Sequence, residues 1–130
     1  DRLGIPVLTT WPAMDLLEDT HPLLVGRPGS LAPRGANWTL QGCDLLLAIG
    51  VRFDSVLTAF NPQGVAPNAK RVVVDIDPAE LRKHGDWATL PVLADAGAFI
   101  REMLRQMTRA KELLGKMFDD LQPPKQEKKP

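Results

Sequence analysis

The sequence predicts an α/β fold with a doubly wound parallel sheet. Two observations favour it: short, continuous apolar runs recur between Gly- and Pro-rich breaks, and helical patterns separate several of these runs. Continuous apolar runs are typical of parallel strands, because helices cover both faces of such a sheet. Alternation of strands with helices favours the doubly wound arrangement. The four expected strands span residues 5–9, 45–49, 71–76 and 90–94.

Helices are expected between and after these strands. Residues 35–43 predict a short helix that leads into the second strand. Asp77 opens the sequence DPAEL and can accept hydrogen bonds from first-turn amides, while the proline that follows suits the first helical position. After Asp95, apolar residues at helical spacing predict a long helix with one apolar stripe facing the sheet. Residues 20–34 hold several prolines and glycines, which predict a loop.

The chain divides into two parts of different character. We expect a truncated nucleotide-fold domain over residues 1–110, and a helix end with a charged, Pro-containing linker or tail over 111–130. A length of 130 residues limits the chain to one such core. The first residues, DRLGIPVLTT, run straight into a strand pattern, so we expect the sequence to start inside a longer protein.

The composition excludes several classes of function. Lys and Arg number 16, as do Asp and Glu, so no broad electrostatic field attracts nucleic acid or an anionic membrane. No apolar run approaches the roughly 20 residues of a membrane span. Cys43 is the only cysteine, which excludes an internal disulfide and a Cys-pair metal site and favours a reducing compartment, here the cytoplasm.

The candidate site lies where the expected strands end, because parallel sheets bind ligands beyond their carboxyl ends. Gly50 allows a ligand to approach the backbone, and Arg52 offers a planar cationic group to a phosphate. Asp75 can accept hydrogen bonds from ribose hydroxyls or an adenine amine. The strand-end residues are Thr9, Thr10, Trp11, Gly50, Val51, Arg52, Asp54, Asp75, Ile76, Asp77, Asp95 and Ala96.

Simpler explanations exist for the charged members of this set. Helix capping alone explains Asp77 and Asp95. Arg52 can equally form an ion pair with a nearby carboxylate, either Asp54 or Asp75. These alternatives stay open at the level of the sequence.

Other polar and aromatic residues favour structural roles. His21 and His84 lack partners at the spacing of a metal or catalytic site, and Cys43 is expected to be a small buried side chain. The sequence has no GxGxxG turn, Walker loop, HExxH motif or nucleophile elbow, so spacing alone predicts no active site. The aromatics expected in the core or at an interface are Trp11, Trp38 and Trp87.

Several segments together resemble a known family. They are PVLTT, VGRPGS, ANWTLQGCDLLLAIGVRFD, APNAKRVVVDIDPAEL and LPVLAD, within residues 3–107. In this order they resemble the central domain of acetolactate synthase and related thiamine-diphosphate-dependent enzymes, especially through GVRFD and VVVDIDPAEL at this separation. The resemblance implies a Rossmann-like, six-stranded parallel sheet between two other domains, which supply the thiamine diphosphate and magnesium site at a subunit interface of an oligomer.

The resemblance also implies an activity and a set of ligand contacts. The whole enzyme would join or decarboxylate 2-keto acids such as pyruvate, whereas this chain alone would be inactive, with no catalytic residue or metal ligand. FAD-bearing members usually show His-Gly where this sequence has Pro28-Gly29, and Arg at the position of Val56. The implied FAD or ADP contacts are Thr10, Trp11, Val25, Gly26, Arg27, Gly50, Val51, Arg52, Asp54, Asp75, Ile76, Asp95 and Ala96.

The resemblance further implies that one strand precedes Asp1. In the family's strand order it lies between the strands expected at 5–9 and 45–49, so its absence would leave two unpaired edges.

Two other functions remain open. Gly, Arg and Asp at strand ends also suit the dinucleotide-binding domain of a flavin- or nicotinamide-dependent oxidoreductase. Exposed apolar helix faces would instead suit a non-catalytic assembly module.

Overall fold

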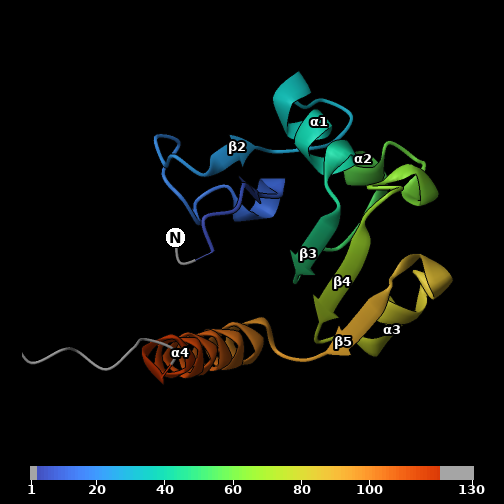
Figure 1. Cartoon of the computed structure of the whole chain (residues 1–130). Coiled ribbons are helices and arrows are strands. Elements are labelled where there is room, and N and C mark those ends of the chain that lie inside the picture. Colours follow the sequence, from blue (N-terminus) through green and yellow to red (C-terminus); the bar gives the residue numbers. More distant parts are fainter. Residues whose placement is uncertain (1–2, 121–130) are drawn as a thin grey trace, which may run out of the picture. The chain divides into compact units, whose positions relative to one another are not determined.

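The computed structural model describes residues 3–120, with side chains to residue 117 (Figure 1). The described residues form two units, which divide between Ala96 and Gly97. The linker or tail predicted from Gln122 onward lies outside the described residues.

Two parallel sheets form the first unit (Figure 1). Strands β1 (Val7–Leu8) and β2 (Leu24–Gly26) form the first sheet. Strands β3 (Leu45–Ile49), β4 (Lys70–Asp75) and β5 (Leu90–Leu93) form the second, in the order β3-β4-β5. Every pairing is parallel, which confirms the predicted α/β fold with parallel strands.

The structure differs from the sequence prediction at the amino-terminal end. Residues 20–34 were expected to form a loop, but β2 lies within them and pairs with β1. The strand expected at 5–9 is shorter, since β1 holds only Val7 and Leu8. Within the described residues β1 pairs only with β2, and β3 only with β4. No strand lies between β1 and β3 there, where the resemblance places the strand before Asp1.

The helices of the first unit that were predicted lie close to their expected positions. Helix α1 (Arg34–Gly42) leads into β3, and α3 (Pro78–Arg82) begins after Asp77 as expected. The amide of Ala79 donates to Asp77 Oδ1 at 2.7 Å, which confirms that Asp77 caps this helix. Between β3 and β4 lies α2 (Ser55–Thr58). Three single turns of 3-10 helix complete the unit: η1 (Trp11–Ala13), η2 (Pro62–Gly64) and η3 (Gly85–Trp87).

The core of the first unit packs against one face of the second sheet. Ala48 and Val73 are partners in the β3–β4 register, so both side chains point to this face. Trp87 packs there and donates from Nε1 to the carbonyl of Val65 at 3.1 Å, which confirms it as a core residue. The buried members are Leu40, Ala48, Phe53, Val65, Ala66, Ala69, Val73, Trp87 and Ala88.

The other two tryptophans lie outside this core. Trp11 is 51% exposed and Trp38 is 68% exposed, so of the two predicted places, core or interface, the core is wrong for both. The guanidinium of Arg34 lies 4.9 Å from the ring centroid of Trp38, a cation–π contact on the surface of α1. An interface role for these two side chains stays a prediction.

Cys43 is half-buried, and its thiol donates to the carbonyl of Leu40 at 3.2 Å. Burial raises the pKa of this thiol.

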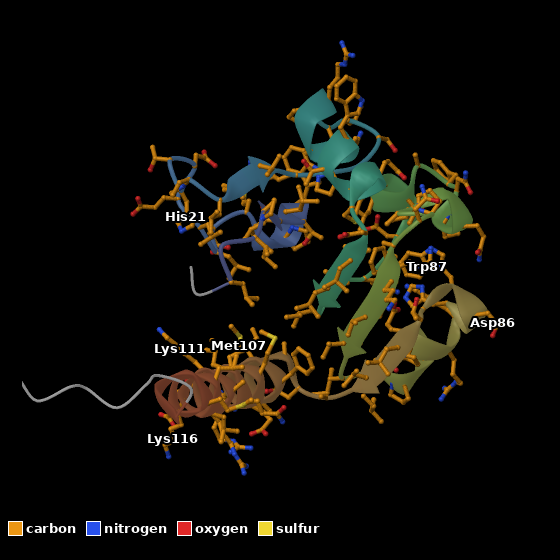
Figure 2. The ribbon with its side chains drawn as sticks, in the orientation of Figure 1. His21, Asp86, Trp87, Met107, Lys111 and Lys116 are labelled. Atoms are coloured by element: carbon orange, nitrogen blue, oxygen red, sulfur yellow. The ribbon has the colours of Figure 1, made fainter. Side chains whose placement is uncertain are left out.

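The second unit contains helix α4 (Ala96–Asp120), which confirms the long helix predicted after Asp95. Met107 and Lys111 lie on one side of it, and Lys116 lies on the opposite side (Figure 2). The half-buried Phe99, Met103, Leu104 and Met107 recur every three or four residues, so the amino-terminal part of the helix has one apolar face. That the apolar stripe faces the sheet stays a prediction. Within residues 3–120 no helix has the length and apolar character needed to cross a bilayer.

A buried histidine in the core predicts acid sensitivity. His84 is 7% exposed, and its ring packs against Phe53 and Trp87 with centroids 5.3 Å away in each case. Burial lowers the pKa of His84, with Lys83 adding to the effect and Glu80 and Asp75 opposing it. The unfolded chain therefore binds a proton before the folded chain does as pH falls through about 6.5.

We expect the free energy of unfolding to fall as pH drops below about 6.5, because the unfolded state takes up the proton first. The measurement is urea unfolding of the chain at pH 7.5 and pH 5.5. His84→Gln should show a smaller difference between the two pH values than the natural sequence. An equal difference in both proteins would contradict the assignment to His84.

Candidate nucleotide-binding edge

The carboxyl ends of β3, β4 and β5 meet at one edge of the second sheet. The amide of Gly50 donates to the carbonyl of Val74 at 2.8 Å, and the amide of Ala94 donates to the carbonyl of Asp75 at 3.0 Å. These bonds extend the ladders one residue beyond β3 and β5. The predicted residues that follow the three strands therefore lie on the same edge.

Gly50 gives this edge an open floor. Its φ angle is 62°, in the left-handed region that favours glycine. A β-carbon placed on Gly50 would have the β-carbon of Ala96 as its nearest neighbour, 4.0 Å away. Within residues 3–120, no side chain therefore fills the space beside this backbone, and a ligand can approach the peptide group closely.

Asp75 has one carboxylate oxygen engaged and the other available. Its Oδ1 accepts from the amide of Asp77 at 2.9 Å, which fixes the side chain at the entrance to α3. Its Oδ2 makes no hydrogen bond within residues 3–120, so this oxygen can accept one from a ligand. The side chain itself is half-buried.

Arg52 has a different partner from either one predicted. Its Nε lies 3.2 Å from Glu80 Oε1, and Glu80 also pairs with Lys83. The prediction of an ion pair with Asp54 or Asp75 is therefore wrong, because the first turn of α3 brings Glu80 within reach. The side chain of Arg52 is 79% exposed, so this pair is weak and screened by solvent.

Asp54 has a structural role in this arrangement. Its Oδ1 accepts from the amide of Leu57 at 2.8 Å and caps α2. Val51 is half-buried and packs against the core, while Ile76 is 70% exposed. Asp95 directly precedes α4, the position of a capping residue, and that role stays a prediction.

The remaining predicted contacts lie in the strands of the first sheet or shortly after them. Gly26 ends β2 with φ 133°, and a β-carbon there would lie 3.6 Å from that of Ala36 in α1. Arg27 donates from Nη2 to Asp19 Oδ1 at 3.1 Å and to the carbonyl of Met14 at 3.3 Å. The guanidinium of Arg27 is thus already hydrogen-bonded within the chain. The other members of this group are Thr10, Trp11 and Val25.

Sequence reasoning missed Glu80 as a member of the edge. Its position in DPAEL indicates only a favourable charge at the start of a helix. Nothing local indicates that α3 turns its first carboxylate toward the residues after β3. The pairing depends on the parallel register of β3 and β4.

Comparison with known proteins defines the class of this chain. The family described as "Thiamine pyrophosphate enzyme, central domain" matches residues 1–103, which is most of the sequence. The chain belongs to this family.

Individual relatives are acetolactate synthases. The probable acetolactate synthase large subunit of Methanococcus aeolicus is 35% identical over 107 residues, covering 82% of this chain and 18% of that protein. The acetolactate synthase of Mycobacterium bovis is 39% identical over 104 residues, covering 80% of this chain and 16% of that protein. The acetolactate synthase large subunit of Corynebacterium glutamicum is 38% identical over 108 residues, covering 83% of this chain and 17% of that protein. The chain thus spans about a sixth of the length of these relatives.

The residues fit the two implied cofactors differently. Within residues 3–120, no three His, Cys, Asp or Glu side chains converge as metal ligands, so this part of the chain does not fit a magnesium–diphosphate site. The open floor at Gly50 and the available oxygen of Asp75 do fit an adenine nucleotide.

Proposed function

We propose that this chain is the central domain of an acetolactate synthase-like enzyme that joins or decarboxylates 2-keto acids such as pyruvate. Family membership and the acetolactate synthase relatives support the proposal. Thiamine diphosphate and magnesium would bind to other parts of the parent enzyme, a cytoplasmic oligomer, and the groups that react would lie there too. These findings favour this function over an oxidoreductase domain or a simple assembly module.

We further propose that the edge around Gly50 seats an adenine nucleotide, either ADP or the ADP half of FAD. One observation supports this proposal: two features lie on the same edge. The backbone of Gly50 has a left-handed φ angle and no side chain covering it, and Asp75 has one carboxylate oxygen available. A ribose hydroxyl can donate to Asp75, and the phosphates can approach the amides that follow β3. Arg52 can exchange Glu80 for a phosphate at little cost, because its present ion pair is exposed.

We expect ADP to raise the melting temperature of the chain, because a ligand that binds only the folded state stabilises it. At a concentration of 100 times the dissociation constant, the gain is about 2.7 kcal/mol. Differential scanning fluorimetry with ADP measures it. Asp75→Asn keeps an oxygen for the Asp77 amide but removes the charge, and should weaken ADP binding.

Two controls separate the parts of this proposal. Arg101→Gln removes an exposed charge on α4 and should leave the ADP response unchanged. With thiamine diphosphate, magnesium and pyruvate, the chain alone should consume no pyruvate. Turnover by the chain would contradict its role as a supporting domain, whereas an unchanged melting temperature with ADP would contradict only the nucleotide seat.

A further inference from the structure

The loop between β2 and α1, residues 27–33, is held by a side chain of α1. The amide of Gly29 donates to Asn37 Oδ1 at 2.9 Å, and Asn37 Nδ2 donates to the carbonyl of Gly29 at 2.9 Å. Gly29 is buried, and Asn37 satisfies both of its backbone polar groups. The position of the loop on α1 therefore depends on the Asn37 side chain.

The same loop contacts α2, which follows β3 in the sequence. Both the amide and the Oγ of Ser30 donate to the carbonyl of Val56, at 2.9 and 3.0 Å. A β-carbon placed on Gly29 would lie 2.9 Å from that carbonyl oxygen, so a larger residue would push the loop away from α2. The loop thus connects α1 to α2 through close polar contacts.

Helix α2 needs support from neighbouring segments. It spans only Ser55–Thr58, and a helix this short is not stable alone. The two residues after it, Ala59 and Phe60, have φ angles of 49° and 60°, which cost free energy in residues other than glycine. The hydrogen bonds from Ser30 therefore help to hold α2 in place.

The turn of the proposed nucleotide seat, residues 50–54, leads directly into α2. Asp54 belongs to both: its amide donates to the carbonyl of Arg52 at 2.7 Å, and its Oδ1 caps the helix by accepting from the amide of Leu57. A shift of α2 would therefore move Asp54, and with it the amides and the Arg52 side chain that the phosphates would approach. A continuous series of hydrogen bonds and covalent links runs from Asn37 to this turn.

We propose that Asn37 is a positioning residue for the phosphates of the bound nucleotide. Through Gly29 and Ser30 it holds α2, and α2 holds the turn 50–54 in the conformation that meets the phosphates. This inference rests on the proposed function, because it takes that turn as the phosphate contact. The ribose contact at Asp75 follows β4 and lies outside this series of bonds. Asn37 should therefore matter for ADP and not for adenosine, which has no phosphates.

The experiment compares the dissociation constants of ADP and adenosine for the natural chain and for Asn37→Ala, measured by NMR titration. We expect Asn37→Ala to weaken ADP binding about tenfold, the effect of losing one charge-assisted contact, while adenosine binding changes by less than about twofold. Ser30→Ala keeps the amide bond to Val56 and loses only the Oγ bond, so it should weaken ADP binding about threefold. A general loss of structure would instead weaken both ligands alike.

Amide hydrogen exchange without ligand tests the connection itself. The amide of Thr58 donates to the carbonyl of Asp54 at 3.0 Å in α2. Its exchange should be about tenfold faster in Asn37→Ala, because α2 opens more often when the loop is released. Unchanged exchange of this amide would overturn the inference, whatever the nucleotide does.

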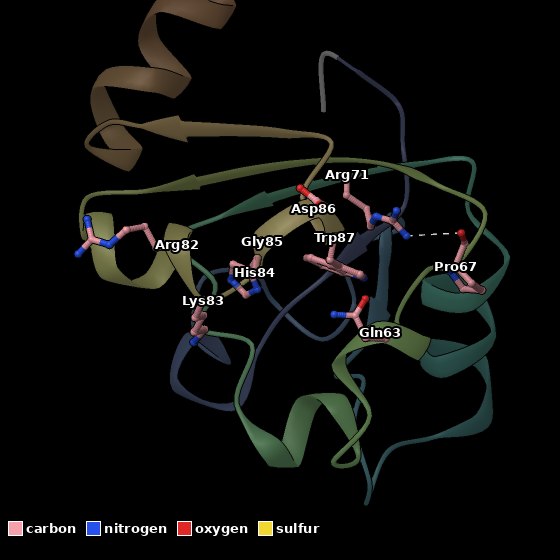
Figure 3. A pocket seen from close by; sticks show the side chains of 9 residues that line it. All are labelled: Gln63, Pro67, Arg71, Arg82, Lys83, His84, Gly85, Asp86 and Trp87. Atoms are coloured by element: carbon pink, nitrogen blue, oxygen red, sulfur yellow. Dashed lines mark hydrogen bonds between the residues drawn. The ribbon is translucent and has the colours of Figure 1, made fainter.

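The matched control is Gln41→Ala, which removes a side-chain bond between α1 and another segment. Gln41 Oε1 accepts from the amide of Ala66 at 3.2 Å. Ala66 and Pro67 precede β4, at the end of the sheet opposite Gly50, where Arg71 also donates to the carbonyl of Pro67 (Figure 3). This variant should lose some stability but keep the ratio of the two dissociation constants and the exchange rate in α2.

The outcomes separate this inference from the nucleotide seat. Equal weakening of ADP and adenosine by Asn37→Ala would overturn the inference, as would an equal change of the ratio in Gln41→Ala. ADP binding that both Asn37→Ala and Ser30→Ala leave unchanged would overturn it while the nucleotide seat stands. If Asn37→Ala does not fold, the ratio in Ser30→Ala decides. If the natural chain binds neither ligand, the nucleotide seat itself is wrong, and the role of Asn37 is overturned with it.

Discussion

Replacing Trp87 with alanine is expected to lower the free energy of unfolding by about 3–5 kcal/mol. The ring is 6% exposed and packs edge-on against Phe53, with centroids 5.0 Å apart. Alanine would leave a cavity and would remove the hydrogen bond that the carbonyl of Val65 accepts. A small α/β domain with a modest core has little stability to spare, so the variant should be largely unfolded.

Trp38→Ala is the matched control for this prediction. Trp38 is 68% exposed and loses only a surface cation–π contact with Arg34, worth about 0.5–1 kcal/mol at such a site. Urea unfolding followed by circular dichroism compares the two variants. If both lose similar stability, or if Trp87→Ala unfolds at the same urea concentration as the natural sequence, Trp87 is not a central core residue.

The sequence predicts those parts of the fold that depend on neighbouring residues. Asp77 caps α3 because its carboxylate reaches an amide two residues away, and the centre of β4 is a run of three valines. Strand β2 was missed because three residues show no periodicity and its only support is pairing with β1. Trp38 was expected in the core or at an interface from its residue type alone, whereas the face of α1 that packs inward depends on the tertiary arrangement.

The candidate site likewise contains features that the sequence predicts and features that it does not. Gly50 and Asp75 were identified because the carboxyl ends of parallel strands share one edge, a rule that needs only the strand positions. The pairing of Arg52 with Glu80 could not be predicted, since Asp54 and Asp75 lie nearer in the sequence.

Gly50→Val is expected to abolish the stabilisation of the chain by ADP and to lower the free energy of unfolding by about 1–3 kcal/mol. The conformational cost arises because a β-branched residue rarely adopts a φ angle of 62°. The valine side chain would also occupy the open floor beside Ala96, where the proposed nucleotide approaches the backbone. Binding and stability should therefore both be lost at this position.

Gly35→Ala separates these effects from the general consequences of replacing a glycine. Gly35 lies in α1 with no heavy atom within 4 Å of an added β-carbon, so alanine should leave stability unchanged or raise it by up to about 1 kcal/mol. The ADP response of that variant should match the natural sequence. Unfolding curves and ADP titrations of both variants test whether the nucleotide binds at Gly50. If Gly50→Val still folds and retains full stabilisation by ADP, the nucleotide does not lie against the backbone of Gly50.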